Sequence, residues 1–223
     1  MADNPKSILT KRQKFLLNIF SSDKNFKSNF YLSGGTALAE YYLHHRYSED
    51  LDFFTEKEID PISIQVFLKS ISDKAGIKNI DFQQSFNRNI VFLHFDNEII
   101  KTEFTYYPFT QIETPEEIEG IKIDSLIDIA VNKTFTIYQK PKSRDFIDLY
   151  LIIKENDLSF SDLRKKARIK FDTHMDPLQM AQQLLEVDNL EDFPRMIEHL
   201  EPEVWRDFWK EEASKLKSEV LTT

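Results

Sequence analysis

The spacing of hydrophobic and polar positions changes along this chain, and the change separates a mixed first part from a helical second part. Apolar residues at helical spacing predict helices at residues 8–20, 36–43 and 61–74. Runs that alternate or are rich in β-branched and aromatic residues predict strands. These runs occupy residues 30–32, 50–54, 80–86, 90–95 and 99–107. The last three are joined by the short polar segments NRN and DNE, so we expect an antiparallel meander.

After residue 108 helical spacing dominates. A short strand at 120–123 is followed by helices at the residues 125–138, 144–155, 160–171, 177–187 and 204–220. The order predicts an α+β fold in which a mixed β-sheet core flanked by helices precedes a helical C-terminal part. We place the two domains at residues 1–110 and 111–223.

Composition narrows the possible function classes. The 223 residues carry a net charge of −9, which argues against attraction of the whole molecule to nucleic acid or to an anionic membrane. No cysteine is present, which excludes disulfides, thiolate zinc sites and cysteine nucleophiles. The N-terminus lacks a secretory pattern, and no apolar run approaches the roughly 18 residues that span a bilayer. We therefore expect a cytoplasmic protein with no membrane partner.

Two carboxylates interrupt the apolar strand at 50–54. Asp50 and Asp52 share one face because side chains two apart in a strand point the same way, whereas Leu51 and Phe53 face the core. Two close carboxylates repel each other unless a cation lies between them, and Mg²⁺ prefers such oxygen ligands. The alternative is that Asp50 caps the start of the strand and Asp52 pairs with an arginine or lysine.

The segment SGG, at Ser33, Gly34 and Gly35, directly precedes a predicted helix. Glycine lets backbone amides approach an anion, and the helix N-terminus favours negative charge. The segment is neither a Walker A loop nor a dinucleotide fingerprint. By itself a Gly-Gly pair is more often a tight turn, but beside two aspartates it indicates a phosphate-binding turn next to a metal site.

A third carboxylate is expected on a neighbouring strand. Glu103 alternates with the more apolar set Thr102 and Phe104, so it can join Asp50 and Asp52 if the strands are adjacent. Equally, it could be a surface glutamate paired with Lys101. In the second part, Lys133 lies among apolar residues and needs an anionic partner, either a nucleotide phosphate or a nearby aspartate.

These motifs occur in a fixed order: SGGTALA, then HHRYSEDLDFF, then VNKTFTIYQKPKSRDFIDLYLI. Together, over about residues 30–155, they resemble the AbiEii/AbiGii toxin family of nucleotidyltransferases, within the DNA-polymerase-β-like superfamily. The resemblance implies that residues 1–110 form a nucleotidyltransferase core with an N-terminal helix. Residues 111–223 would be a mainly helical part that completes the nucleotide site.

The resemblance also assigns roles by position. Asp50, Asp52 and Glu103 would be catalytic and would hold two Mg²⁺ ions, although superfamily members commonly have aspartate where this chain has Glu103. The nucleotide would be bound by the SGG turn and by residues before and after the sheet; these nucleotide-binding residues are Ser33, Gly34, Gly35, Arg46, Lys133, Arg144, Asp145 and Asp148. An internal network of Lys133, the aspartates and Arg144 is an alternative reading, as is a simple pair of Arg144 with Asp148.

The function implied is transfer of NMP from an NTP to an acceptor, either RNA such as tRNA or a protein. The enzyme would be the toxin of a toxin–antitoxin or abortive-infection system with a cognate antitoxin. One alternative is an inactive nucleotide-binding module, and another is a housekeeping enzyme acting on a small molecule. The basic run RKKARIK at 164–170 could hold an RNA backbone, but a solvated helix face explains it more often.

Overall fold

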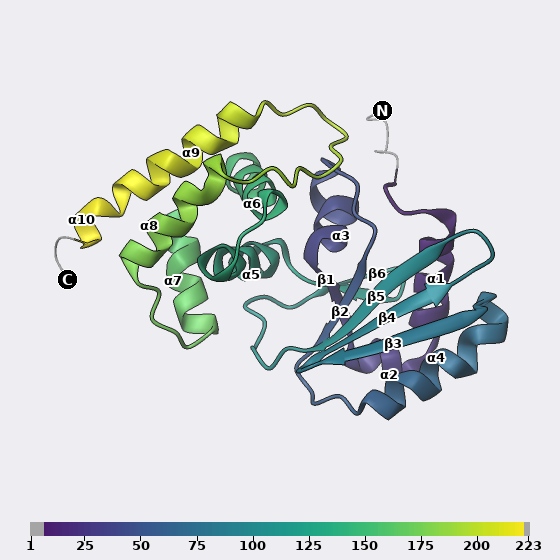
Figure 1. Ribbon diagram of the computed structural model, residues 1–223. Helices are drawn as coiled ribbons and strands as arrows, with labels where there is room; N and C mark the ends of the chain where they lie inside the picture. The colour runs from purple at the N-terminus through teal and green to yellow at the C-terminus, as the bar shows by residue number, and fades with distance from the viewer. Residues whose placement is uncertain (1–6, 221–223) are drawn as a thin grey trace. The chain divides into compact units, whose positions relative to one another are not determined.

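The computed structural model describes residues 7–220 (Figure 1). The chain forms two compact units. The first contains the chain up to His44 together with Ser48–Ser125, and the second contains His45–Tyr47 together with the chain from Leu126 onward. The predicted domain division after residue 110 separates the same two kinds of structure, but it leaves two short strands with the helices; it stays a prediction.

The first unit is built on a mixed sheet, as the pattern predicted. Within residues 7–220 seven strands form one sheet in the order β3-β4-β5-β2-β1-β7-β6. Strand β2 runs parallel to β5 and antiparallel to β1, which makes the centre of the sheet mixed. The strands are β1 (Tyr31–Ser33), β2 (Leu51–Thr55), β3 (Asn79–Ser85), β4 (Arg88–His94), β5 (Ile99–Tyr106), β6 (Glu116–Ile118) and β7 (Ile121–Ile123).

The helices of this unit begin and end at capping residues. They are α1 (Lys11–Ser22), α2 (Lys24–Asn29), α3 (Gly34–Leu38), the π-helix η1 (Ala39–Leu43) and α4 (Pro61–Ala75). The predicted helix at 8–20 begins later, at Lys11, because Thr10 and Gln13 form a capping box. Helix α2 was not predicted; its signal was Asp23, whose carboxylate accepts a hydrogen bond from the amide of Phe26.

An aromatic cluster fixes which face of the sheet is buried. The rings of Phe20, Phe26 and Phe67 come from α1, α2 and α4, and those of Phe53 and Phe104 come from β2 and β5. The centroids of Phe53 and Phe104 are 5.7 Å apart, and the rings are stacked. Figure 1 shows these three helices on the same side of the sheet. Residues that alternate with Phe53 and Phe104 therefore point to the opposite face.

The meander of β3, β4 and β5 is confirmed, with a register that differs slightly from the expected one. The first turn consists of Phe86 and Asn87 instead of the predicted NRN segment, so Arg88 is the first residue of β4. Phe86 adopts a left-handed conformation with φ of 50°. The consequence is that Arg88 pairs with Thr105 on β5 and lies within the sheet.

The second unit is helical. Its helices are α5 (Leu126–Gln139), α6 (Ser143–Glu155), α7 (Phe160–Lys170), α8 (Pro177–Leu185), the 3₁₀ helix η2 (Glu186–Asp188), α9 (Pro202–Lys215) and α10 (Lys217–Val220). Each predicted helix of this part is present, with ends displaced by a few residues. The core includes Trp209 of α9, whose ring meets those of Phe146 on α6 and Phe160 on α7. Among residues 7–220, none of the helices has the length and apolarity needed to cross a membrane.

Candidate active site

The two aspartates of the Asp-x-Asp segment lie on the face of the sheet away from the aromatic cluster. Asp50 directly precedes β2 and Asp52 lies within it, between the buried Leu51 and Phe53, as predicted. Oδ2 of Asp50 is 2.5 Å from Nζ of Lys101 on β5. Both side chains of this ion pair are about a third exposed, at 35% and 31%. Asp50 therefore has a cation partner that solvent or a ligand can reach.

The glycine turn and Asp52 are in contact. Ser33 pairs with Asp52 across β1 and β2, so the turn that follows Ser33 begins beside this aspartate. Gly34 has φ of +72°, and a Cβ atom added to it would lie 2.9 Å from Oδ2 of Asp52. Glycine is therefore required at this position both by the backbone conformation and by the carboxylate packed against it.

Three hydrogen bonds hold this turn and its surroundings. The Ser33 hydroxyl donates to Oδ2 of Asp124 at 2.7 Å, and the Gln111 amide donates to Oδ1 of the same carboxylate at 2.8 Å. The hydroxyl of Thr36 donates to the backbone carbonyl of Asp50. Sequence reasoning missed Asp124; the only signal was a single carboxylate directly after the strand at 121–123. Its contact with Ser33 places a buried carboxylate beside the glycine turn.

Glu103 lies where the sequence predicted. It pairs with Asp52 across the parallel strands β2 and β5, so the two carboxylates share one face. Arg88 binds Glu103 through two hydrogen bonds of 2.6 Å, and the Thr105 hydroxyl donates to the same carboxylate at 2.7 Å. Burial raises the pKa of Glu103, but the hydrogen bonds from Arg88 and Thr105 outweigh it and hold this pKa below its ordinary value.

The donor set gives a mixed answer on metal binding. Asp50 and Asp52 have the oxygen chemistry that Mg²⁺ prefers, on one face of one strand. Glu103 already accepts three hydrogen bonds, of roughly four that a carboxylate can accept. Within the part of the chain that the structure describes, no three His, Asp or Glu side chains are gathered as a metal site. Asp50 and Asp52 thus fit Mg²⁺, whereas Glu103 has little remaining capacity to coordinate a metal ion.

A second group of predicted residues is assembled around Asp148 in the helical unit. The fully buried carboxylate of Asp148 accepts two hydrogen bonds of 2.7 Å from Arg46, and it contacts Nε2 of His45 and Nζ of Lys133 at 2.7 Å each. Burial raises the pKa of Asp148, but Lys133 and Arg46 outweigh it and hold this pKa well below its ordinary value. Arg46 also donates to the carbonyl of Tyr47. A contact between Arg46 and a triphosphate stays a prediction.

Lys133 has the anionic partners that its apolar surroundings required. Its Nζ lies 3.1 Å from Oδ1 of Asp145 as well as 2.7 Å from Oδ2 of Asp148, and its side chain is largely buried. Arg144 is exposed and is not the partner of Asp148, because Arg46 occupies that carboxylate. The internal-network alternative is therefore correct for Lys133 and the two aspartates, with Arg46 in place of Arg144.

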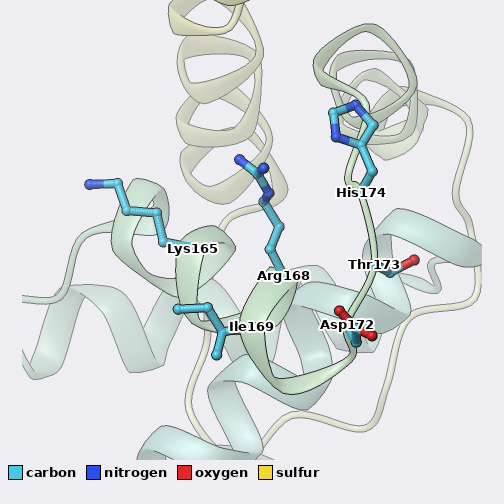
Figure 2. A pocket seen from close by; sticks show the side chains of 6 residues that line it. All are labelled: Lys165, Arg168, Ile169, Asp172, Thr173 and His174. Atoms are coloured by element: carbon cyan, nitrogen blue, oxygen red, sulfur yellow. The ribbon is translucent and has the colours of Figure 1, made fainter.

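The basic run of α7 lines a groove in the helical unit. The groove has a volume of about 730 Å³, and its lining includes Lys165, Arg168 and His174. Figure 2 shows Arg168 between Lys165 on the helix and His174 on the segment that follows it. Lys165 contacts Asp162 at 2.8 Å, whereas Arg168 makes no ion pair with any residue in the range 7–220. The run is therefore more than a uniformly solvated helix face.

Residues 16–222 match the family described as nucleotidyl transferase AbiEii toxin, Type IV TA system. The chain belongs to the AbiEii family. The resemblance carried by the three motifs is thereby confirmed, and the AbiEii match extends well beyond residue 155, where the resemblance ended. As an AbiEii member, the chain is a nucleotidyltransferase by family.

The chain is also similar to a curated relative and to two solved structures. An uncharacterised protein of Aquifex aeolicus (strain VF5), aq_aa25, is 32% identical over 148 residues, which are 65% of this chain and 67% of the relative. The crystal structure of a candidate nucleotidyltransferase from H. pylori has a TM-score of 0.59 at 20% identity, covering 96% of this chain and 98% of that one. JHP933 from Helicobacter pylori has a TM-score of 0.56 at 20% identity, covering 97% and 96%. The two structures show that the fold is shared.

Proposed function

We propose that this protein transfers an NMP group from an NTP to an acceptor in a Mg²⁺-dependent reaction, and that it is the toxin of a toxin–antitoxin pair. The observation that carries the proposal is the contact between the glycine turn and the Asp-x-Asp segment, in which Gly34 leaves room for the carboxylate of Asp52. This arrangement places a turn suited to phosphate beside two carboxylates suited to a metal.

The chain's own residues would bind and orient the nucleotide. Asp50 and Asp52 would hold Mg²⁺, with Glu103 as the third carboxylate of the site. When bound, the ion would supply positive charge that stabilises the transferring phosphate. The backbone at Gly34 and Gly35 would receive the phosphates, while the Ser33–Asp124 hydrogen bond fixes the turn. Catalysis would rest mainly on positioning and electrostatics.

The covalent change is simple. The acceptor hydroxyl oxygen forms a bond to the α-phosphorus, the bond from that phosphorus to the bridging oxygen breaks, and pyrophosphate leaves. The hydroxyl proton is released to water. In the helical unit, the buried ion pairs with Asp145 and Asp148 would keep the ammonium of Lys133 in place.

The groove along α7 favours RNA over protein as the acceptor. A protein with net charge −9 repels RNA as a whole, so RNA binding requires a local basic surface. The groove would supply one, since Arg168, Lys165 and His174 line it and Arg168 forms no ion pair within residues 7–220. The antitoxin is proposed from the family alone.

The test incubates purified protein with Mg²⁺, each α-labelled NTP in turn, and either total RNA or a protein extract. We expect label on RNA with the wild type and its loss with Asp52→Asn, a substitution of nearly equal volume. Asp81→Asn is the matched control, because Asp81 is an exposed carboxylate on β3 of the same sheet. Nucleotide binding without any transfer would contradict the proposal and favour the binding-module alternative.

A further inference from the structure

Glu103 and Arg88 form a bidentate ion pair on the face that carries the aspartates. Arg88 donates from Nε to Oε1 and from a terminal nitrogen to Oε2, each at 2.6 Å, so the fork of the guanidinium matches the carboxylate. The Thr105 hydroxyl donates to Oε1 at 2.7 Å. Oε1 thus accepts two hydrogen bonds and Oε2 one, which leaves Glu103 little capacity to coordinate a metal.

The two partners differ sharply in exposure. The side chain of Glu103 is 7% exposed, whereas that of Arg88 is 55% exposed. Two of the five guanidinium N–H groups donate to Glu103, and the other three have no partner within residues 7–220. A buried carboxylate therefore holds a guanidinium whose remaining donors are open to solvent and to a ligand.

The register of the sheet brings this guanidinium to the aspartates. Arg88 pairs with Thr105 on β5, and its side chain reaches back along the sheet to Glu103. Glu103 in turn lies opposite Asp52, and Asp52 contacts the turn at Gly34. The guanidinium is thus held next to the face on which a nucleotide and its metal would meet.

We propose that Arg88 is a phosphate-binding residue of this site and that Glu103 is its positioning residue. The ligand class is the polyphosphate of a nucleoside triphosphate, including the pyrophosphate that leaves. Arginine suits this task because its planar fork can bind a carboxylate on one edge and phosphate oxygens with its remaining donors. The inference rests on the proposed function, and it gives Glu103 a role other than metal ligand.

The experiment measures binding, so that it does not depend on turnover. Affinity for an α,β-methylene NTP, which cannot be cleaved at the reacting bond, is measured by titration calorimetry in Mg²⁺. Affinity for Mn²⁺ alone is measured by electron paramagnetic resonance without nucleotide. The variants are Arg88→Ala, Arg88→Lys and Glu103→Gln. The matched control is Arg12→Ala, which removes an exposed arginine–glutamate pair, Arg12 with Glu98, from the same unit.

We expect Arg88→Ala to weaken nucleotide affinity about 10–100-fold, because charge-assisted hydrogen bonds to phosphate are lost. Arg88→Lys should restore only part of it, since lysine lacks the fork. Glu103→Gln should weaken nucleotide affinity in the same direction while Mn²⁺ affinity stays at the wild-type value. Arg12→Ala should change neither quantity.

A double variant, Arg88→Ala with Glu103→Gln, covers the case in which the single alanine variant fails to fold. It leaves no uncompensated charge, and its loss of nucleotide affinity should equal that of one single variant, since the two residues act as one unit. Loss of Mn²⁺ binding in Glu103→Gln, or wild-type nucleotide affinity in a folded Arg88 variant, would overturn the inference. Failure of the wild type to bind nucleotide at all would instead refute the proposed function.

Discussion

The carboxylates of the sheet unit and those of the helical unit are both paired with cations, but their surroundings differ. Asp50 pairs with Lys101, and both side chains are about a third exposed. Asp148 is fully buried and contacts His45, Arg46 and Lys133. An exposed ion pair contributes little to the free energy of unfolding. Removing one partner of a buried ion pair lowers the free energy of unfolding strongly, because it leaves an uncompensated buried charge.

The difference in burial indicates different roles for the two groups of carboxylates. The Asp50–Lys101 pair is open to water, because both of its side chains are about a third exposed. Asp148 can exchange nothing, because each of its oxygens is held by protein donors in a dry interior. The buried network therefore fixes the position of Lys133, whereas the Asp50–Lys101 pair is accessible to solvent.

The largest expected effect comes from breaking the buried network. Asp148→Asn should lower the free energy of unfolding by about 3–5 kcal/mol, because it leaves Arg46 and Lys133 as buried cations with one fewer counter-charge. The measurement is chemical denaturation of the full chain followed by circular dichroism. Asp162→Asn is the control, since that carboxylate is exposed and pairs with the exposed Lys165, so its loss should leave the free energy of unfolding near the wild-type value.

The pH dependence of stability tests the same buried network. The pKa of Asp148 is lowered in the folded protein, so its stabilisation is present above pH ~3.9, the ordinary value for aspartate, and is lost as pH falls below it. The free energy of unfolding of the wild type should therefore fall more steeply below that pH than that of Asp148→Asn. Equal slopes, or a variant within about 1 kcal/mol of the wild type at neutral pH, would contradict the role given to the network.

A smaller effect is expected at the glycine turn of the sheet unit. Gly34→Ala places a Cβ atom 2.9 Å from Oδ2 of Asp52 at φ of +72°. It should cost about 1–3 kcal/mol of stability, from backbone strain, and should also displace Asp52. Gly76→Ala is the matched control, because Gly76 has φ of +73° but its nearest added contact is 3.8 Å away, on Arg12.

Comparison of the two glycine variants distinguishes the effect of backbone strain from the effect of displacing Asp52. Both should lose stability in thermal denaturation, but only Gly34→Ala should lose nucleotide transfer in the labelled-NTP assay. If Gly76→Ala loses transfer to the same extent at a temperature where both are folded, the contact between Gly34 and Asp52 does not matter for activity.

The smallest effect concerns the α7 groove. Arg168→Ala should reduce the slope of log K against log salt for RNA by about 1, since one phosphate contact is removed. Lys166→Ala is the control, because Lys166 is exposed on the same helix but does not line the groove. Fluorescence anisotropy with labelled tRNA in Mg²⁺ and without NTP measures both slopes. Equal slopes for the two variants would show that the groove has no special role.

The sequence by itself determined the elements and the facing of the Asp-x-Asp segment. Periodicity located most helices and most strands, and alternation placed Asp50 and Asp52 opposite Leu51 and Phe53. Both follow from local rules, because a side chain's face in a strand depends only on its position. Local signals also explain the misses: the capping box at Thr10 and the cap at Asp23 were present but were not used.

Tertiary structure decided which charges meet. Arg46 and Asp148 are 102 positions apart, and Lys101 lies 51 positions from Asp50. Even Arg88 and Glu103, 15 positions apart, meet only because the turn at Phe86 sets the register of β4. Several lysine or arginine side chains could have paired with each carboxylate, and the residue types alone do not determine which one does. The choice depends on how strands and helices pack, since an ion pair is a contact in space and the sequence records only its two ends.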